Sequence, residues 1–313
     1  MNAFERFLVA DRSSREIVKL ASRAAATEST VLIEGESGVG KDLLATCIHY
    51  ASRRAEGPMV RIDCPNLSED LLECELFGYE PGAFTDARGR KMGKFELANG
   101  GTLYIDGIDT LSLVLQSKLL RPLQERAIER LGSTSARKLD VRVIASSQHN
   151  LVDEVRKGMF RGDLFYRLQV IHLKIPPLRE RKADIPALAL YLSTDAGARA
   201  AKPGFQIASD ALSLLATYDW PGNVRELRNV IERLAVMAMD TTATREDILA
   251  ALPSIEPLGR HQEPLTLREM EIVYIQEVLR RARGNKSRAA SILGISRKSF
   301  YDRLRREGGA KLH

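Results

Sequence analysis

Short, largely apolar runs alternate with longer helical patterns over the first 175 residues of the chain. Five runs, at residues 31–33, 59–62, 102–105, 141–145 and 170–174, have the composition of β-strands. Because helix-length stretches separate them, these runs predict parallel strands that are covered on both faces. The pattern therefore predicts an α/β fold in which a parallel sheet lies between two layers of helices.

After Pro176 and Pro177 the β pattern ends, and apolar residues recur three and four positions apart. This spacing predicts helices over residues 184–193, 209–218, 224–239 and 245–252. The proline-rich, polar segment that follows is typical of a linker. We expect four parts: an α/β subdomain over residues 1–175, a helical subdomain over 176–252, a linker over 253–264 and an all-α domain over 265–313.

The composition is that of a globular chain, with 44% hydrophobic and 28% charged residues among 313. Cys47, Cys64 and Cys74 form no C-x-x-C pair, and the five histidines have no ligand spacing. We therefore expect buried thiols, with neither a disulfide framework nor a metal site made of protein ligands alone. The chain shows no bilayer-length apolar run and no secretion signal at its start, which predicts a cytoplasmic protein without membrane contact.

Positive charge is concentrated in the C-terminal segment. The whole chain carries a net charge of +6, but residues 264–313 hold twelve Lys and Arg against five Asp and Glu, a net charge of +7. The preceding residues are thus close to neutral. A compact basic segment predicts nucleic acid as a partner.

Residues 31–42 have the pattern of a strand, a glycine-rich turn and a helix start, with GESGVGKD in the turn. Glycines let backbone N–H groups converge on phosphate oxygens, and a lysine at the helix start reaches the terminal phosphates. The pattern predicts a phosphate-binding loop, with a plain strand-to-helix turn as the alternative. The candidate binding residues are Gly35, Glu36, Ser37, Gly38, Val39, Gly40, Lys41 and Asp42.

An acidic residue ends another predicted strand, in GGTLYID at residues 100–106. Asp106 is expected at the carboxyl edge of the sheet, where such sheets bind ligands, unless it only caps the next helix. Asp42 stands where phosphate-binding loops usually carry a hydroxyl that contacts Mg²⁺. Asp106 and Asp42 are therefore the candidate Mg²⁺ ligands.

These residues, with four further motifs, resemble one family, the sigma-54-dependent transcriptional activators or bacterial enhancer-binding proteins. The further matches are ELFGYEPGAFTDA at 75–87, FRGDLFYRL at 160–168, PPLRER at 176–181 and WPGNVREL at 220–227. The resemblance implies an AAA+ ATPase with an α-helical lid and a helix-turn-helix domain. It also implies a ring, usually a hexamer, with ATP bound between subunits.

The resemblance further implies a loop that contacts sigma-54 and remodels the closed complex of RNA polymerase. Phe84 is a candidate apolar anchor in this small, polar loop, or else it packs beneath its own hairpin. Asp86 stands where the family usually has glycine. The candidate contact residues are Gly82, Ala83, Phe84, Thr85, Asp86 and Ala87.

Three arginines complete the candidate catalytic set with Asp106. By resemblance, Arg161 and Arg167 are arginine fingers that reach the γ-phosphate of the neighbouring subunit, and Arg225 is the lid arginine that senses the nucleotide. A planar guanidinium suits both roles because it pairs with phosphate bidentately. The alternatives are surface salt bridges and a solvated helix face. Trp220 is expected to anchor the core.

The chain departs from the family where water is activated. Gly107 follows Asp106 where the family has a glutamate that orients the attacking water, and Asp63 replaces the asparagine that holds this glutamate. Loss of a water-positioning group commonly costs roughly 10²–10⁴ in rate. We hypothesise slow hydrolysis, or dependence on a paralogous subunit in a mixed ring. Asp109 and Asp63 are the carboxylates that could substitute.

The C-terminal segment resembles the Fis-type helix-turn-helix of the same family. An apolar stripe over residues 267–279 suits a dimer contact; two short helices follow, with a turn at Gly294 and Phe300 and Leu304 facing inward. An amphipathic hairpin without DNA is the alternative. The candidate DNA contacts are Lys286, Arg288, Ser296, Arg297, Lys298, Ser299, Tyr301, Asp302 and Arg303, with Arg305 and Arg306 on phosphates.

These features predict an activator that binds enhancer-like DNA and remodels the sigma-54 RNA polymerase closed complex. The alternative is a DNA-binding regulator whose AAA+ module binds ATP for assembly with little catalysis. Only a short helix precedes the glycine-rich turn. We therefore expect no N-terminal sensory domain and control by a separate inhibitor or partner subunit.

Overall fold

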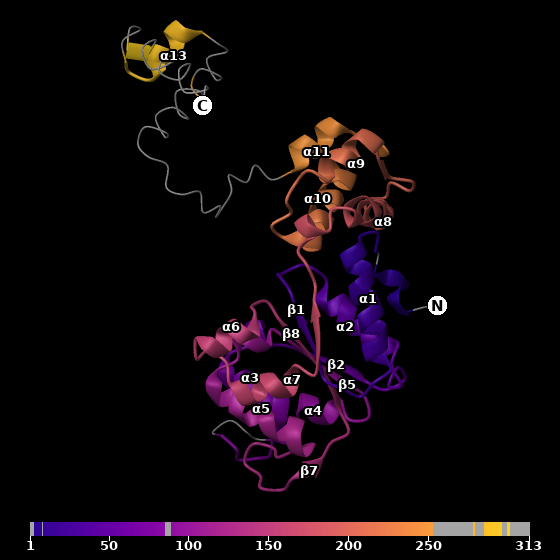
Figure 1. The fold of residues 1–313 in the computed structure, drawn as a ribbon, viewed down its shortest axis with the longest axis vertical. Helices are drawn as coiled ribbons and strands as arrows, with labels where there is room; N and C mark the ends of the chain where they lie inside the picture. Colours follow the sequence, from indigo (N-terminus) through magenta and orange to yellow (C-terminus); the bar gives the residue numbers. More distant parts are fainter. Residues whose placement is uncertain are drawn as a thin grey trace. The chain divides into compact units, whose positions relative to one another are not determined.

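The computed structural model describes residues 3–7, 9–84, 89–238, 240–252, 278, 285–295 and 299–300. The chain forms two compact units, residues 1–252 and 253–313 (Figure 1). Each unit is described by itself.

A five-stranded parallel sheet forms the centre of the first unit, in the order β2-β5-β8-β1-β9. All five predicted strands are confirmed. Their bounds are β1 Val31–Glu34, β2 Met59–Asp63, β5 Thr102–Asp106, β8 Arg142–Ser147 and β9 Ile171–Lys174.

Helices cover both faces of this sheet because the strand residues are apolar on both sides. Val31 and Ile33 pack with α1 and α2, whereas Leu32 between them packs with α3, α5 and α7 on the other face (Figure 1). The helices are α1 Arg12–Ala25, α2 Lys41–Tyr50, α3 Glu69–Phe77, α4 Lys94–Leu97, α5 Leu113–Glu125, α6 Leu151–Arg156 and α7 Gly162–Leu168. The predicted α/β class is therefore confirmed.

Short elements connect the layers. Four 3-10 turns are η1 Ala3–Arg6, η2 Cys64–Asn66, η3 Ile108–Thr110 and η4 Leu178–Glu180. Two antiparallel pairs join β3 Gly78–Tyr79 with β4 Lys91–Met92 and β6 Ala127–Ile128 with β7 Arg137–Lys138.

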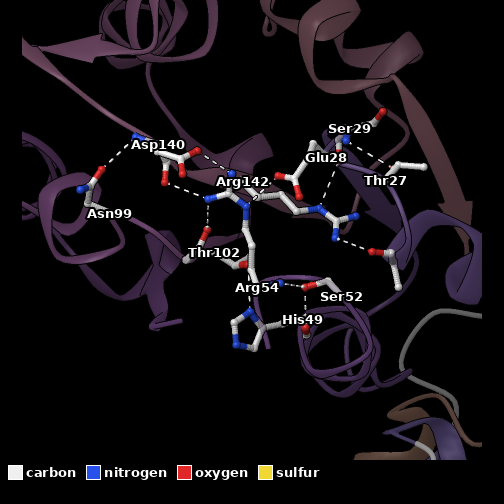
Figure 2. A network of polar contacts seen from close by, with 12 residues as sticks. Thr27, Glu28, Ser29, His49, Ser52, Arg54, Asn99, Thr102, Asp140 and Arg142 are labelled. Carbon is white, nitrogen blue, oxygen red and sulfur yellow. Dashed lines mark hydrogen bonds and ion pairs between the residues drawn. The ribbon is translucent and has the colours of Figure 1, made fainter. Parts of the chain in front are cut away.

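Polar residues brace the amino edge of the sheet, opposite the nucleotide motifs (Figure 2). The buried Arg142 at the start of β8 donates from Nη2 to the carbonyl of Ala24, 2.7 Å away, at the end of α1. Arg54 pairs with Asp140, and His49 meets Thr102 at 2.9 Å. Each of these side chains is bonded to another part of the same unit, so the network holds the ends of the strands to the neighbouring helices and loops.

Four helices form the second layer of the first unit, as predicted: α8 Asp184–Arg199, α9 Ser209–Leu215, α10 Asn223–Met237 and α11 Arg245–Ala251. Trp220 is fully buried in their core and donates from Nε1 to the carbonyl of Leu215, which confirms its role as an anchor. Helix α8 runs further than predicted because the small Ala196 and Gly197 pack under Phe205.

Two sequence expectations about this unit were wrong. The β pattern does not end at Pro177, because β10 Gln206–Ile207 and β11 Thr242–Ala243 form a short parallel pair in the helical part. Cys47 and Cys64 are buried, but Cys74 is only half-buried, since α3 turns Leu72 and Leu76 towards the core instead.

In the second unit, α13 Lys286–Ile292 leads to a turn at Gly294, where φ is +66°. Phe300 is buried with Val278 and Ala290, as the inward position of Phe300 predicts. The predicted dimer stripe, apart from Val278, and most of the second predicted helix lie outside the described residues. Among the helices of the described chain, none has the length and apolar character needed to cross a bilayer.

Candidate nucleotide site

The glycine-rich turn joins the carboxyl end of β1 to the start of α2. Gly38 and Gly40 have φ values of +78° and +101°, which favour glycine over other residues. A Cβ at Gly38 would also lie 2.5 Å from the carbonyl oxygen of Gly222. Glycine at position 38 therefore allows the helical part to pack directly on the turn.

Lys41 is buried at the start of α2 and lies across this turn. Its Nζ donates to the carbonyls of Gly35 and Glu36 at 2.6 and 3.0 Å. Burial lowers the pKa of Lys41, and the carboxylates of Asp106 and Asp109 oppose that shift. The ammonium group is thus held where a polyphosphate would meet the turn.

Asp106 ends β5 at the same edge of the sheet. One carboxylate oxygen accepts from Ser146 Oγ at 2.5 Å and from the Tyr104 hydroxyl at 3.1 Å. Burial raises the pKa of Tyr104, which keeps the phenol a donor. The other oxygen of Asp106 accepts from Arg61.

Arg61 is a site residue that the sequence analysis missed. It pairs with Asp106, lies 3.8 Å from the Asp42 carboxylate and sits over the Tyr104 ring. The available signal was its position on the edge strand β2, two residues before Asp63, which is in register with Asp106. Residues two apart share a face of a strand.

The helical part contributes its own side chains through the WPGN turn before α10. Arg225 Nη1 donates to Ser37 Oγ at 2.7 Å, and the N–H of Val224 donates to the Gly38 carbonyl at 3.0 Å. The buried Asn223 donates to Glu36 Oε2 at 3.1 Å and to the Ser37 carbonyl at 3.0 Å. The turn therefore fixes the start of α10 on the phosphate-binding segment.

One cavity of about 490 Å³ collects these groups. Its lining residues are Ser37, Gly38, Gly40, Lys41, Asp42, Leu43, Thr46, Arg61, Asp106, Gln148, Val224, Arg225 and Arg228. The structure thus brings Lys41, both candidate Mg²⁺ ligands and Arg225 together. Within the described residues no group of three or more His, Cys, Asp and Glu could hold a metal alone.

Gly107 has a backbone that favours glycine, with φ at +74°. Its N–H donates to Ser146 Oγ at 3.1 Å, and a Cβ at this position would lie 2.7 Å from the Pro65 ring. Asp63, the altered partner position, accepts from Asn66 Nδ2 at 2.8 Å. Asp109 accepts from the backbone of residues 148–149 and from the His149 ring.

The two candidate finger arginines lie outside this cavity. Arg161 pairs with Asp163 at 2.8 Å, at the start of α7. Arg167 donates to the Leu123 carbonyl at 3.1 Å and lines a separate cavity of about 330 Å³. Neither contacts the groups around Lys41.

The candidate sigma-54 loop begins after β3. Gly82, Ala83 and Phe84 are described, and Phe84 is 42% exposed with its ring 5.0 Å from that of Tyr79. Residues 85–87, which include Asp86, lie outside the described part.

Of the candidate DNA contacts, Lys286 and Arg288 are exposed on α13, and Asn285 Oδ1 accepts from the Arg288 N–H at 3.0 Å. Ser299 is described next to the buried Phe300. The remaining candidates, Ser296, Arg297, Lys298, Tyr301, Asp302 and Arg303, lie outside the described residues.

Three family models match consecutive parts of the chain. A sigma-54 interaction domain matches residues 7–174, an AAA+ ATPase lid domain matches residues 179–263, and a bacterial regulatory protein model of the Fis family matches residues 266–306. The second and third matches agree with the helical layer and with the turn at Gly294.

Curated relatives match nearly the whole chain. Regulatory protein AtoC of Escherichia coli (strain K12) is 44% identical over 302 residues, which cover 94% of this chain and 66% of AtoC. The Nif-specific regulatory protein of Azotobacter vinelandii is 42% identical over 93% of this chain and 56% of its own length. The chain thus spans less than two thirds of either relative.

Solved structures confirm the AAA+ fold. NtrX from Brucella abortus, crystallised in complex with ATP, has a TM-score of 0.72 and 33% identity over 96% of this chain and 69% of its own. Its ADP complex gives the same TM-score at 34% identity, over 95% and 68% of the two chains. A RuvB mutant from Thermotoga maritima, 16% identical with a TM-score of 0.52, shares the fold alone.

Proposed function

The chain belongs to the sigma-54-dependent transcriptional activators, the bacterial enhancer-binding proteins, and from this premise we propose that it binds ATP and uses it to activate sigma-54 promoters. One observation carries the proposal. The cavity around Lys41 is lined both by the α/β part and by α10 of the lid, so a nucleotide bound there would couple the two.

The cavity groups have distinct roles in this proposal. Lys41 and the N–H groups of residues 35–40 bind the phosphates. Arg225, a residue of α10, contacts the same turn and couples phosphate binding to the position of this helix. Asp106 and Asp42, whose carboxylates line the same cavity, would hold Mg²⁺. When bound, Mg²⁺ neutralises charge on the β- and γ-phosphates.

The positions of Arg161 and Arg167 support a ring. Both guanidinium groups lie outside the cavity of their own subunit. Arginine fingers supplied in trans must be placed in this way, because they serve the site of a neighbour. We therefore propose a hexamer assembled from dimers, in which each subunit completes the ATP site of the next.

Different segments of the chain contact polymerase and DNA in this proposal. The loop of residues 82–87 presents the exposed Phe84 to sigma-54. The basic segment of residues 264–313, with Lys286 and Arg288 exposed, binds an enhancer-like DNA site. Hydrolysis in the ring then remodels the closed polymerase complex.

A second candidate function is favoured by the substitutions at positions 107 and 63. Gly107 has no side chain that could orient water, and Asp63 is held by Asn66. On this alternative the AAA+ ring binds ATP as an assembly scaffold, and turnover comes from a paralogous subunit in a mixed ring.

The test measures ATP turnover and promoter opening together. The steady-state ATPase rate of the full chain is followed against protein concentration, and open complexes are counted on a sigma-54 promoter with sigma-54 polymerase. A self-sufficient activator gives a rate per subunit that climbs with concentration, and open complexes that Lys41→Ala abolishes. Binding of ATP and DNA with no turnover and no open complexes would establish the scaffold instead.

A further inference from the structure

The carboxyl edge of the sheet needs a group that accepts a proton from water, and the nearby carboxylates are engaged elsewhere. Both oxygens of Asp106 already accept hydrogen bonds, from Ser146 and Tyr104 on one side and from Arg61 on the other. Asp63 is bound by Asn66. Position 107 offers only backbone.

Asp109 is different, because its buried carboxylate holds a histidine. The side chain of Asp109 is 1% exposed and accepts from the N–H groups of Gln148 and His149 at 3.3 Å. The same oxygen lies 2.7 Å from His149 Nδ1. These contacts fix the segment after β8 to η3, and they fix the orientation of the imidazole ring.

The pairing determines which nitrogen of His149 can be an acceptor. A carboxylate oxygen only accepts, so Nδ1 carries the hydrogen of this contact, and Nε2 is the ring nitrogen that can offer a lone pair. The His149 side chain is 68% exposed, so that nitrogen is accessible. A carboxylate that orients a histidine in this way is the arrangement used for general-base catalysis.

The pair adjoins the lining of the nucleotide cavity. Gln148, the residue before His149, lines the cavity with Lys41 and Asp106. Asp109 lies in η3, which follows β5, and His149 lies just after β8; β5 and β8 are neighbours in the sheet, so both residues follow strand ends that meet at this edge. The Asp109 carboxylate is close enough to Lys41 to counter the effect of burial on the pKa of Lys41.

We propose that His149 is the catalytic residue that accepts the proton of the attacking water during ATP hydrolysis, with Asp109 as its positioning residue. Water oxygen bonds to the γ-phosphorus while the bond from that phosphorus to the bridging oxygen breaks, and its electron pair stays on ADP. The water proton passes to Nε2 and then to solvent, which leaves ADP and inorganic phosphate. This inference rests on the proposed ATPase function and names the residues that replace the side chain absent at position 107.

The experiment compares His149→Ala, Asp109→Asn and the control Glu154→Gln in the full chain. Glu154 is a carboxylate close enough to His149 for their charges to interact, but its hydrogen-bond donor is Lys157 Nζ, 2.8 Å away. We expect kcat to fall about 10²-fold or more in the first two variants and to stay unchanged in the control. Their double variant should be no slower than either single variant, because the pair acts as a unit.

Two further readouts separate catalysis from structure. Added imidazole should restore turnover to His149→Ala, whose exposed side chain contributes little to folding. The same variant should bind ADP–aluminium fluoride about 10²-fold more weakly while its affinity for ADP is unchanged, since the lost contact exists only with the attacking water.

Other outcomes overturn the inference in distinguishable ways. Variants that turn over ATP like the wild type would exclude the pair and leave the proposed function intact. A wild type that binds ATP but never hydrolyses it would exclude the pair and favour the scaffold. A wild type that does not bind ATP would remove the proposed function as well.

Discussion

At the scale of single residues, Gly107 lacks the side chain that would orient water, and its backbone conformation and close neighbours also favour glycine. The left-handed φ of +74° and the Pro65 ring 2.7 Å from its missing Cβ both favour glycine. A glutamate there would need a rearranged η2 turn. The surroundings of position 107 therefore favour glycine, which predicts that one substitution does not restore the missing chemistry.

The first prediction is that Gly107→Glu destabilises the protein and does not raise the ATPase rate by itself. The left-handed backbone alone costs a side chain about 1–2 kcal/mol, and contact with Pro65 adds to this. Chemical denaturation measures the loss. Pro65→Ala combined with Gly107→Glu should recover part of the stability because it removes the ring contact. A stable single variant with faster turnover would contradict this prediction.

Arg61 leads to a second prediction about Mg²⁺. Its guanidinium pairs with Asp106 and lies near Asp42, so it competes with a cation for both candidate ligands. Exposed ion pairs are worth up to about 1 kcal/mol, which is about a fivefold change in an equilibrium. Arg61→Gln should lower the Mg²⁺ concentration for half-maximal ATP binding by up to that factor. Arg53→Gln, on the preceding loop, serves as a control with no expected effect.

At the scale of elements, the WPGN turn joins the lid to the nucleotide-binding turn. Asn223 accepts from the Leu178 N–H at 2.7 Å and donates to the turn, while Arg179 forms a bidentate pair with Glu36 at 2.6 and 2.9 Å. These contacts link α10 and η4 to one side of the cavity. The lid is therefore bonded to the same segment that would bind phosphate.

The third prediction concerns Asn223→Ala. The change leaves the buried Leu178 N–H without its partner, which costs about 1–3 kcal/mol, and φ at this position is +53°, where asparagine is better tolerated than alanine. Equilibrium denaturation should show that loss together with weaker ATP binding. Val236→Ala, at an exposed position of the same helix, should change neither.

Acid should weaken the link between lid and turn, which gives a fourth prediction. The hydrogen bond from Arg179 holds the pKa of Glu36 below its ordinary value of 4.5. A lowered folded-state pKa stabilises the protein above the ordinary value, and that contribution is lost as pH falls through the folded value. Because the pair is partly exposed, the loss is below about 1 kcal/mol. Glu36→Gln should show a smaller decline in unfolding free energy between neutral and acid pH, and an equal decline would contradict the assignment.

Sequence patterns predicted the elements better than the contacts between them. The five strands were recognisable in the sequence because both faces of the sheet are apolar. Lys41, Asp106 and Arg225 were recognisable because each belongs to a motif with a local physical role. The sequence did not indicate Arg61 or the pairing of Asp109 with His149, because these contacts depend on how neighbouring strands are placed. Strands β10 and β11 have two residues each, which is too short to produce a recognisable hydrophobic pattern in the sequence.

At the scale of the whole molecule, the two compact units differ in charge and in chemistry. The first unit holds the nucleotide cavity, whereas residues 264–313 carry a net charge of +7. Electrostatic attraction to phosphates is strongest for the basic unit. DNA binding and nucleotide binding should therefore respond to different conditions, and salt is the most direct of them.

The last prediction follows from counterion release. Suppose that Lys286, Arg288, Arg305 and Arg306 each contact one phosphate, so that a dimer makes about eight such contacts. A plot of the logarithm of DNA affinity against the logarithm of salt concentration should then have a slope of about −7. Lys286→Ala combined with Arg288→Ala should halve that slope, whereas Lys157→Ala in the first unit should leave it unchanged. Fluorescence anisotropy with labelled duplex DNA at several salt concentrations measures all three slopes. A double variant that keeps the full slope would place the phosphate contacts on other residues, and a slope near zero in the wild type would exclude the basic segment as a DNA-binding surface.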